Sequence, residues 1–178
     1  MAVGPAPLIE RGGNVTIVAA NSFLLDAVEV GGAKLADALG VAPPGSWPPL
    51  YNEPEVFAWI RRMMERHPGA PGWFTWFIVA DGQLCGTCGY KGPPSADGSV
   101  EIGYSVIPEC QRRGIASNAV ELLVARAFRD ETVKAVRAET LADGTASQGV
   151  LRRCGFLAAG SYIDPEEGEI LRFERRRS

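Results

Sequence analysis

The chain has 178 residues, a hydrophobic fraction of 46% and a formal net charge of −3. This length is enough for one domain with a proper core, and the hydrophobic content is too high for a disordered chain. The small net charge gives no reason to expect nucleic acid or an anionic membrane as the main partner. No apolar run is long enough to span a membrane, and residues 1–9 lack the pattern of a signal peptide, so we expect a cytoplasmic protein.

The N-terminal part of the sequence predicts one strand followed by helices. Residues 14–20 (NVTIVAA) are typical of a strand, and apolar residues then follow helical spacing as far as Leu39. Gly31-Gly32 should break or bend that helix. Residues 40–49 contain two proline pairs and predict a loop, and the apolar stripe of residues 54–67 predicts a further helix.

The rest of the chain predicts an alternation of strands and helices. Strands at residues 73–80 and 83–90 flank Asp81-Gly82, a strong two-residue hairpin signal. Residues 114–128 form the clearest helix, because their apolar positions fall on one face. The other predicted elements are strands at 100–107, 136–141, 156–162 and 170–175, and a short helix at 145–154. This order predicts a mixed α/β chain that forms one domain over residues 1–178.

The cysteines and the single histidine bear on metal and redox chemistry. Cys85 and Cys88 have a C-x-x-C spacing, but positions i and i+3 of a strand point to opposite faces. There is no second such pair, and His67 stands at the predicted end of a helix, where a cation suits the helix dipole. We therefore expect small, buried or half-buried thiols at Cys85 and Cys88, and no metal site.

The segment Gln111-Arg112-Arg113-Gly114-Ile115-Ala116 lies between a predicted strand and the start of the clearest helix. A helix N-terminus exposes unpaired N–H groups and can hold phosphate oxygens. A glycine and an alanine leave space for a close ligand, and two arginines add positive charge. The alternative is a plain turn with two solvated arginines. The segment is neither a P-loop nor a dinucleotide-binding fingerprint.

This segment resembles the Q/R-x-x-G-x-G/A pyrophosphate signature of the GNAT acetyltransferase superfamily. The preceding V-E-I-G-Y-S-V-I-P-E resembles the fourth strand of that superfamily. Residues 138–156 (AETLADGTASQGVLRRCGF) are similar to the branch that acetylates the N-termini of ribosomal proteins. The resemblance as a whole covers about residues 73–162.

The resemblance implies a GNAT-type α/β (α+β) fold, with a mixed, mostly antiparallel sheet of about seven strands and about four flanking helices. The sheet should splay at its centre, between the strands at 100–107 and 136–141. Acetyl-CoA would lie in that opening, bound by the core at 73–162, while residues 1–70 would shape the acceptor side. The implied contacts to acetyl-CoA are Ser105, Val106 and Ile107 for the pantetheine arm, and Gln111, Arg112, Arg113, Gly114, Ile115, Ala116 and Ser117 for the pyrophosphate.

The resemblance also implies an N-acetyltransferase, in which a primary amine of a protein N-terminus, a peptide or a small molecule attacks acetyl-CoA directly. Glu101 is the first candidate for the general base, and Glu139 is the reserve. Ser147 stands where the ribosomal-protein branch carries a serine proposed as general acid. Leu151 replaces the tyrosine that many relatives use for that step, and Gly144 replaces an asparagine. These two departures keep open an alternative, a non-catalytic acyl-CoA-binding sensor or partner subunit, and transfer of another acyl group also stays open.

Two aromatic residues are candidates for the acceptor site. Trp47 and Tyr51 lie in the Pro-rich loop, where a packed core role is less automatic. The acidic loop at residues 164–169 could favour a cationic amine, although a solvated turn is an equal alternative. Besides acetyl-CoA and this amine, we expect neither nucleic acid nor a membrane as partner, and a monomer or a homodimer.

Overall fold

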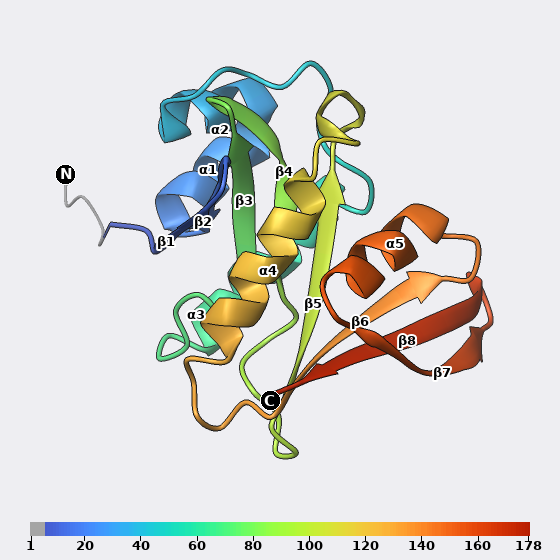
Figure 1. Cartoon of the computed structure of the whole chain (residues 1–178). Helices are drawn as coiled ribbons and strands as arrows, with labels where there is room; N and C mark the ends of the chain where they lie inside the picture. The colour runs from blue at the N-terminus through green and yellow to red at the C-terminus, as the bar shows by residue number, and fades with distance from the viewer. Residues whose placement is uncertain (1–5) are drawn as a thin grey trace.

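The computed structural model describes residues 6–178, whose strands form one eight-stranded sheet (Figure 1). The strand order is β1-β2-β3-β4-β5-β6-β8-β7. The strands are β1 (Ile9–Gly12), β2 (Val15–Ala19), β3 (Thr75–Ala80), β4 (Gln83–Tyr90), β5 (Ser99–Val106), β6 (Ala135–Leu141), β7 (Leu157–Asp164) and β8 (Gly168–Arg176). The helices are α1 (Ser22–Val30), α2 (Gly32–Leu39), α3 (Pro54–Arg66), the 3₁₀ turn η1 (Pro108–Cys110), α4 (Ile115–Ala127) and α5 (Thr145–Arg153).

The sheet splays between β5 and β6, which pair in parallel while every other neighbouring pair is antiparallel. Their pairing covers only Ser99–Ile102 against Ala135–Ala138. Beyond this closed end, as we call it, β5 continues to Val106 and stays paired with β4, whereas β6 continues to Leu141 and stays paired with β8. The two strands diverge visibly there (Figure 1), and this divergent part is called the open end. The splayed, mostly antiparallel sheet predicted above is therefore confirmed.

The helices cover the two faces of the first five strands. Adjacent strand residues point to opposite faces, so Trp76 faces the core that includes α4, while Phe77 faces the core built with α1, α2 and α3. Both side chains are fully buried. The short helix α5 lies against β6 and α4, on the far side of the splay. The two halves of the sheet thus carry separate helices, which leaves the open end accessible.

The element count differs slightly from the prediction of about seven strands and four helices. The additional strand is Ile9–Gly12, which has one apolar residue and whose residues are all exposed or half-buried. Its sequence therefore has no hydrophobic alternation that would predict a strand. It joins the sheet through a hairpin whose turn contains Gly13 at φ 59°. The predicted break at Gly31-Gly32 divides one periodic stretch into α1 and α2, with Gly31 at φ 146°.

All four cysteines are buried, but the predicted thiol is wrong for Cys85. Cys85 forms a disulfide with Cys110, across a Cα–Cα distance of 5.7 Å, and not with Cys88. Burial raises the pKa of Cys88 and that of Cys154, to about 11 for the latter, so both stay protonated thiols at neutral pH.

The end of α3, the possible metal ligands and the helix lengths give three further findings. His67 ends α3, with Nδ1 2.9 Å from the carbonyl oxygen of Met63, as its position in the sequence predicted. Within residues 6–178, no three His, Cys, Asp or Glu side chains gather as metal ligands would. No helix in this part of the chain has the length and hydropathy needed to cross a bilayer.

Candidate active site

The open end of the sheet exposes backbone groups of β5. Ile107 N donates to Cys85 O at 2.9 Å, so the backbone of this residue faces β4. Because backbone groups alternate in direction along a strand, those of Tyr104 and Val106 face the gap. β6 does not pair with them, since its register with β5 ends at Ile102. The gap is therefore lined on one side by backbone donors and acceptors that an extended ligand can use.

The start of α4 lies next to this gap and is open to a ligand. Gly114 is the N-cap, with a left-handed φ of 73°, and no atom of the described residues lies within 4 Å of the position that a Cβ would take there. No side chain from residues 6–178 caps the helix, so the first N–H groups of α4 have no capping partner in this part of the chain. The Ser117 hydroxyl oxygen is buried without a hydrogen-bond partner in the described part of the chain. Space, free donors and an orphaned hydroxyl fit a pyrophosphate.

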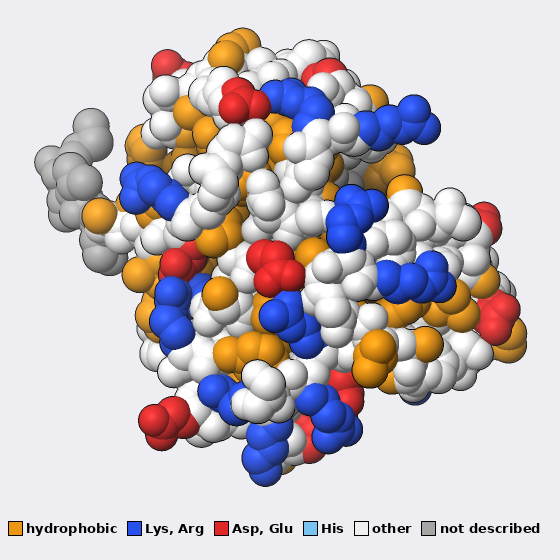
Figure 2. Space-filling view, in the orientation of Figure 1, with side chains coloured by type: hydrophobic (Ala, Val, Ile, Leu, Met, Phe, Trp, Pro, Cys, Tyr) orange, Lys and Arg blue, Asp and Glu red, His pale blue; other side chains and the backbone are white. Residues whose placement is uncertain are grey.

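Positive charge surrounds that helix start. Arg112 and Arg113 are exposed, and Figure 2 shows Lys and Arg side chains on this face over both the start of α4 and α5. Arg113 is bound to Asp81 at 2.5 Å, whereas Arg112 makes no ion pair within residues 6–178. Arg152 and Arg153 in the last turn of α5 are also exposed. The residues predicted to hold the pyrophosphate thus lie together at one helix end.

Two of the predicted pantetheine contacts are already engaged. The side-chain amide of Gln111 donates to Val106 O at 3.0 Å, and Ile107 N bonds to β4 as described above. Ser105 pairs with Thr87 of β4, and its side chain lies on the opposite face of β5 from that of Tyr104. Among these predicted contacts, Val106 directs its N–H into the gap, and its carbonyl oxygen keeps a second lone pair for a ligand beside the bond from Gln111.

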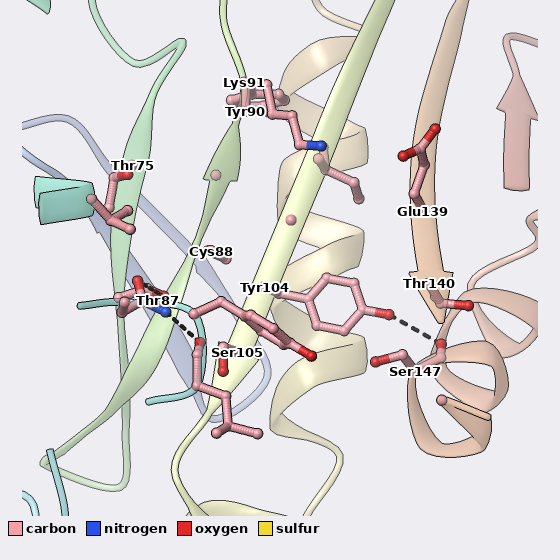
Figure 3. Close-up of a pocket in the computed structure, with 18 of the residues that line it drawn as sticks. Thr75, Thr87, Cys88, Tyr90, Lys91, Tyr104, Ser105, Glu139, Thr140 and Ser147 are labelled. Atoms are coloured by element: carbon pink, nitrogen blue, oxygen red, sulfur yellow. Dashed lines mark hydrogen bonds between the residues drawn. The ribbon is translucent and has the colours of Figure 1, made fainter. Parts of the chain in front are cut away.

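A cleft of about 670 Å³ opens from the splay towards α3 (Figure 3). It is lined by residues from the loop before α3, from α3, and from β4, β5, β6, α5 and the β7–β8 hairpin. Ser105 and Ser147, predicted for different parts of the site, both line it. A ligand in the gap and a second ligand in the cleft could therefore meet between β5 and α5.

Tyr104 was not singled out by sequence reasoning, yet it crosses the open end. Its hydroxyl donates to the backbone carbonyl of Ser147 on α5 at 3.1 Å, as the dashed line in Figure 3 shows. Burial raises the pKa of the phenol, so it keeps its proton at neutral pH. Leu151 is fully buried, so nothing replaces the missing tyrosine at that position. The hydroxyl groups of Tyr104 and Ser147 both line the cleft at this end.

The two candidate bases occupy different places. Glu101 lies at the closed end of β5, where its carboxylate forms an ion pair with Lys91. Lys91 lines the cleft but Glu101 does not. Glu139 does line the cleft, yet it accepts hydrogen bonds from Tyr162 Oη at 2.9 Å and from an arginine of β8. The structure thus brings Glu101 to the border of the cleft, and Glu139 to its wall.

The two aromatic candidates for the acceptor site separate. Tyr51 lines the cleft and is 63% exposed. Trp47 is half-buried against the core and does not line the cleft; it packs so closely on Gly32 that a Cβ there would lie 2.5 Å from its Cγ. The sequence could not distinguish the two, because both lie in the same proline-rich loop.

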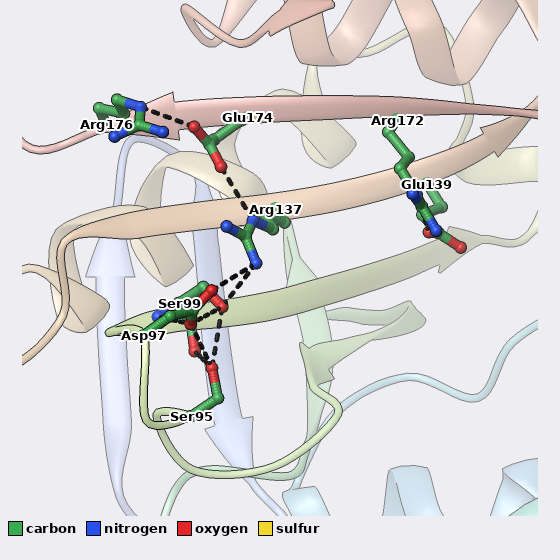
Figure 4. A network of polar contacts seen from close by, with 8 residues as sticks. All are labelled: Ser95, Asp97, Ser99, Arg137, Glu139, Arg172, Glu174 and Arg176. Carbon is green, nitrogen blue, oxygen red and sulfur yellow. Dashed lines mark hydrogen bonds and ion pairs between the residues drawn. The ribbon is translucent and has the colours of Figure 1, made fainter. Parts of the chain in front are cut away.

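A polar network connects the strands at the closed end (Figure 4). The guanidinium of Arg137 on β6 donates to Glu174 on β8 at 2.8 Å. It also donates to Asp97, just before β5, at 3.0 Å and to Ser99, the first residue of β5, at 2.9 Å. Hydrogen bonds from Ser95 and Ser99, and then from Arg137, hold the pKa of Asp97 well below its usual range. Side-chain bonds thus reinforce the short stretch in which β5 and β6 still pair.

Comparison with known proteins agrees with this architecture. A protein-family model described as an acetyltransferase (GNAT) domain matches residues 34–157. The Bacillus subtilis (strain 168) protein named "Uncharacterized N-acetyltransferase YjdG" is 29% identical over 136 residues, which are 75% of this chain and 80% of that protein.

Solved structures of similar fold include two acetyltransferases. RimL, a ribosomal L7/L12 alpha-N-protein acetyltransferase in complex with coenzyme A, has a TM-score of 0.72 at 18% identity, over 95% of this chain and 98% of that chain. The ribosomal-protein-S5-alanine acetyltransferase from Vibrio fischeri has a TM-score of 0.67 at 18% identity, over 95% of this chain and 96% of that chain. At 18% identity, these structures show only that the fold is the same.

Proposed function

Because the chain belongs to the GNAT acetyltransferase family, we propose that it is a single-domain enzyme in which a primary amine directly attacks the acetyl group of acetyl-CoA. The observation that carries this proposal is the juxtaposition at the open end. There the unpaired backbone of β5 borders the cleft, which Tyr104 and Ser105 line, and also the segment before the N-terminus of α4, where Gln111 bonds to Val106. Such an arrangement would hold two substrates side by side, as direct transfer without a covalent enzyme intermediate requires.

Acetyl-CoA supplies the activated acyl group, and the chain supplies its orientation. The start of α4 from Gly114 to Ser117 would hold the pyrophosphate, with Arg112 beside it. The backbone of Val106, which faces the gap, would orient the chain that carries the thioester. Its N–H can also stabilise the negative charge that develops on the carbonyl oxygen during attack.

The acceptor must lose a proton, because an amine with an ordinary pKa near 8 to 10 is mostly ammonium at neutral pH. Glu101 is our candidate for the base, directly or through water. Its carboxylate already binds one primary ammonium, that of Lys91, at the border of the cleft. An acceptor ammonium could take the place of the Lys91 Nζ, which would bring the acceptor nitrogen next to the base.

The departing thiolate has an ordinary pKa near 8.5 and needs little help. Ser147 lines the cleft on the α5 side and can donate a hydrogen bond to it. The phenol of Tyr104 could turn its single O–H from Ser147 O to the thiolate, although its raised pKa favours a hydrogen bond over complete proton transfer. The acid step is thus shared between hydroxyl groups rather than assigned to one tyrosine of α5.

The proposal is tested by measuring release of free thiol from acetyl-CoA with a panel of amines, and the acetylated product by mass. We expect amine-dependent release. Tight binding of acetyl-CoA without turnover on any amine would instead support the sensor or partner-subunit alternative. Faster turnover with another acyl-CoA would show that acetyl-CoA is not the preferred donor.

The base is tested separately. Glu101→Gln should lower kcat/KM about a hundredfold, most strongly at low pH, because the remaining rate depends on amine that is already neutral. Glu139→Gln is the matched control, since it removes the carboxylate of the neighbouring strand. A Glu101→Gln profile that overlays the wild type, with loss of rate in Glu139→Gln, would move the base to Glu139.

A further inference from the structure

The turn that carries Tyr51 is held in an uncommon backbone conformation. Tyr51 has φ 63°, a left-handed value that bulky residues rarely adopt. The side chain of the buried Asn52 holds the turn: its Nδ2 donates to Leu50 O at 2.8 Å, and its Oδ1 accepts from Thr87 Oγ1 of β4 at 2.9 Å. Strain of this kind persists only where the surroundings enforce it, and it concentrates at functional sites.

The strained turn presents apolar groups to the cleft. Leu50 is 75% exposed, Tyr51 is 63% exposed and Trp59 of α3 is 44% exposed, and all three line the cleft. We call these residues the apolar wall. Large apolar side chains that gather in a concave site commonly mark a surface that a ligand covers. A purely cationic or strongly polar acceptor would leave the apolar wall in contact with water.

The other side of the cleft is acidic. Glu139, Asp164 and Glu167 line it, and the cation among the described lining residues is Lys91, which is paired with Glu101. Backbone N–H groups of Glu167 and Glu166 hold the pKa of Asp164 below its usual range, so this carboxylate is ionised at neutral pH. Glu139 is paired with Arg172, whereas Glu167 makes no ion pair within residues 6–178. This side suits a cation and repels an acceptor that carries a carboxylate.

We propose that the acceptor is an amine whose neighbouring group is bulky and apolar or aromatic, with its ammonium on the acidic side and its apolar group against the apolar wall. This inference rests on the function proposed above and names the class of its substrate. The chemistry is shared by a peptide that begins with Phe or Leu and by a small aryl-alkyl amine such as 2-phenylethylamine. Burying such a group should raise kcat/KM about ten- to a hundredfold over an acceptor without it.

The test measures kcat/KM for four peptides that differ only in their first residue, Phe, Leu, Ser or Asp, and for 2-phenylethylamine. We expect the Phe and Leu peptides to exceed the Ser peptide about tenfold or more, and the Asp peptide to be the poorest. The ratio between the Phe peptide and 2-phenylethylamine tells whether the site takes peptides or small amines. Equal rates for Phe and Ser, or a preference for Ser or Asp, would overturn the inference and leave the acetyltransferase function intact. Absence of turnover on every amine would overturn the function itself.

Variants show whether the apolar wall is the cause. Tyr51→Ala should reduce the Phe-to-Ser ratio about tenfold, and Tyr51→Phe should restore it, because the ring and not the hydroxyl makes the contact. Thr87→Val removes the hydrogen bond to Asn52 with little change of shape, so it should reduce the same ratio by acting through the turn. Phe23→Ala is the matched control, since Phe23 is also 63% exposed but lies on α1 and does not line the cleft. A ratio unchanged in both Tyr51→Ala and Thr87→Val would overturn the assignment.

Discussion

The two ends of the β5–β6 boundary use the same pair of strands in opposite ways. At the closed end the strands pair over Ser99–Ile102, and Arg137 connects both of them to β8. At the open end Tyr104 and Val106 face a gap, and the contact across it is the hydrogen bond from Tyr104 to α5. The comparison teaches that side-chain bonds reinforce the paired stretch, whereas the unpaired stretch leaves backbone groups of β5 open to a ligand. A site built on strands held in this way is more rigid than one built on loops.

The largest effect should come from blocking the open end. Gly114→Trp should weaken binding of acetyl-CoA at least about a hundredfold, or about 2.8 kcal/mol, because the indole would fill the space at the start of α4. Calorimetry measures this affinity. Gly40→Trp is the control, since Gly40 is also left-handed, at φ 69°, and equally free of neighbours, but it ends α2. Wild-type affinity in a folded Gly114→Trp variant would show that the open end is not where acetyl-CoA binds.

A smaller effect is expected from the two hydroxyl groups at the open end. Ser147→Ala should lower kcat about ten- to a hundredfold, at or below the low end for a general acid. Tyr104→Phe, which keeps the ring and removes the bridge to Ser147 O, should cost about tenfold or less. Both kcat and the Kd of acetyl-CoA should be measured. If Ser147→Ala keeps the wild-type kcat and only the Kd rises, Ser147 contacts the cofactor and the thiolate leaves without its help.

The smallest effect should come from the closed end. Arg137→Gln should reduce the free energy of unfolding by about 0.5–1 kcal/mol at neutral pH, because the pair with Glu174 is partly exposed and screened. Bonding to Arg137 holds the pKa of Glu174 below its usual value, so the carboxylate stabilises the fold above its unfolded pKa, near 4.3. That contribution is lost as the pH falls through the lower folded pKa. Urea unfolding at several pH values below about 5 should therefore give a shallower decline in Arg137→Gln than in the wild type.

The control for that measurement is an isolated surface pair. Lys34 and Asp37 on α2 lie 3.5 Å apart with exposed side chains, and Lys34→Gln should change little. If Arg137→Gln unfolds like the wild type at every pH, the network does not stabilise the closed end. If Arg137→Gln lowers both the stability and the affinity for acetyl-CoA, the closed end controls the width of the open end.

Local patterns made most of the fold predictable. The hairpin at Asp81-Gly82 and the helix after Gly114 carry strong signals within a few residues, and the structure has both. The strand Ile9–Gly12 escaped prediction because its place in the sheet depends on pairing with β2 and not on its own apolar content. The same limit applies to the disulfide between Cys85 and Cys110, which lie 25 positions apart and meet through the fold.

In the candidate site too, local features could be predicted from the sequence and long-range contacts could not. The segment from Gln111 to Ser117 could be placed because its chemistry lies in consecutive residues. The contacts of Tyr104 with Ser147 and of Asn52 with Thr87 join residues 43 and 35 positions apart. Such contacts depend on strand register and loop path, which a hydrophobic pattern does not specify. Because side chains alternate along a strand, Tyr104 and Ser105 lie on opposite faces of β5. This alternation is the sequence signal that could have pointed to Tyr104.

The contact between Gly32 and Trp47 has a consequence for comparing relatives. Any side chain at position 32 would overlap Trp47, and a Cβ there would also lie 3.0 Å from Pro44. The indole would have to move, and with it the loop that ends in the turn at Tyr51. Two homologues with identical cleft residues could therefore accept different amines if one has alanine where this chain has Gly32. Grouping family members by substrate from their cleft residues alone would miss this difference, since the residue that decides it lies on a helix outside the cleft.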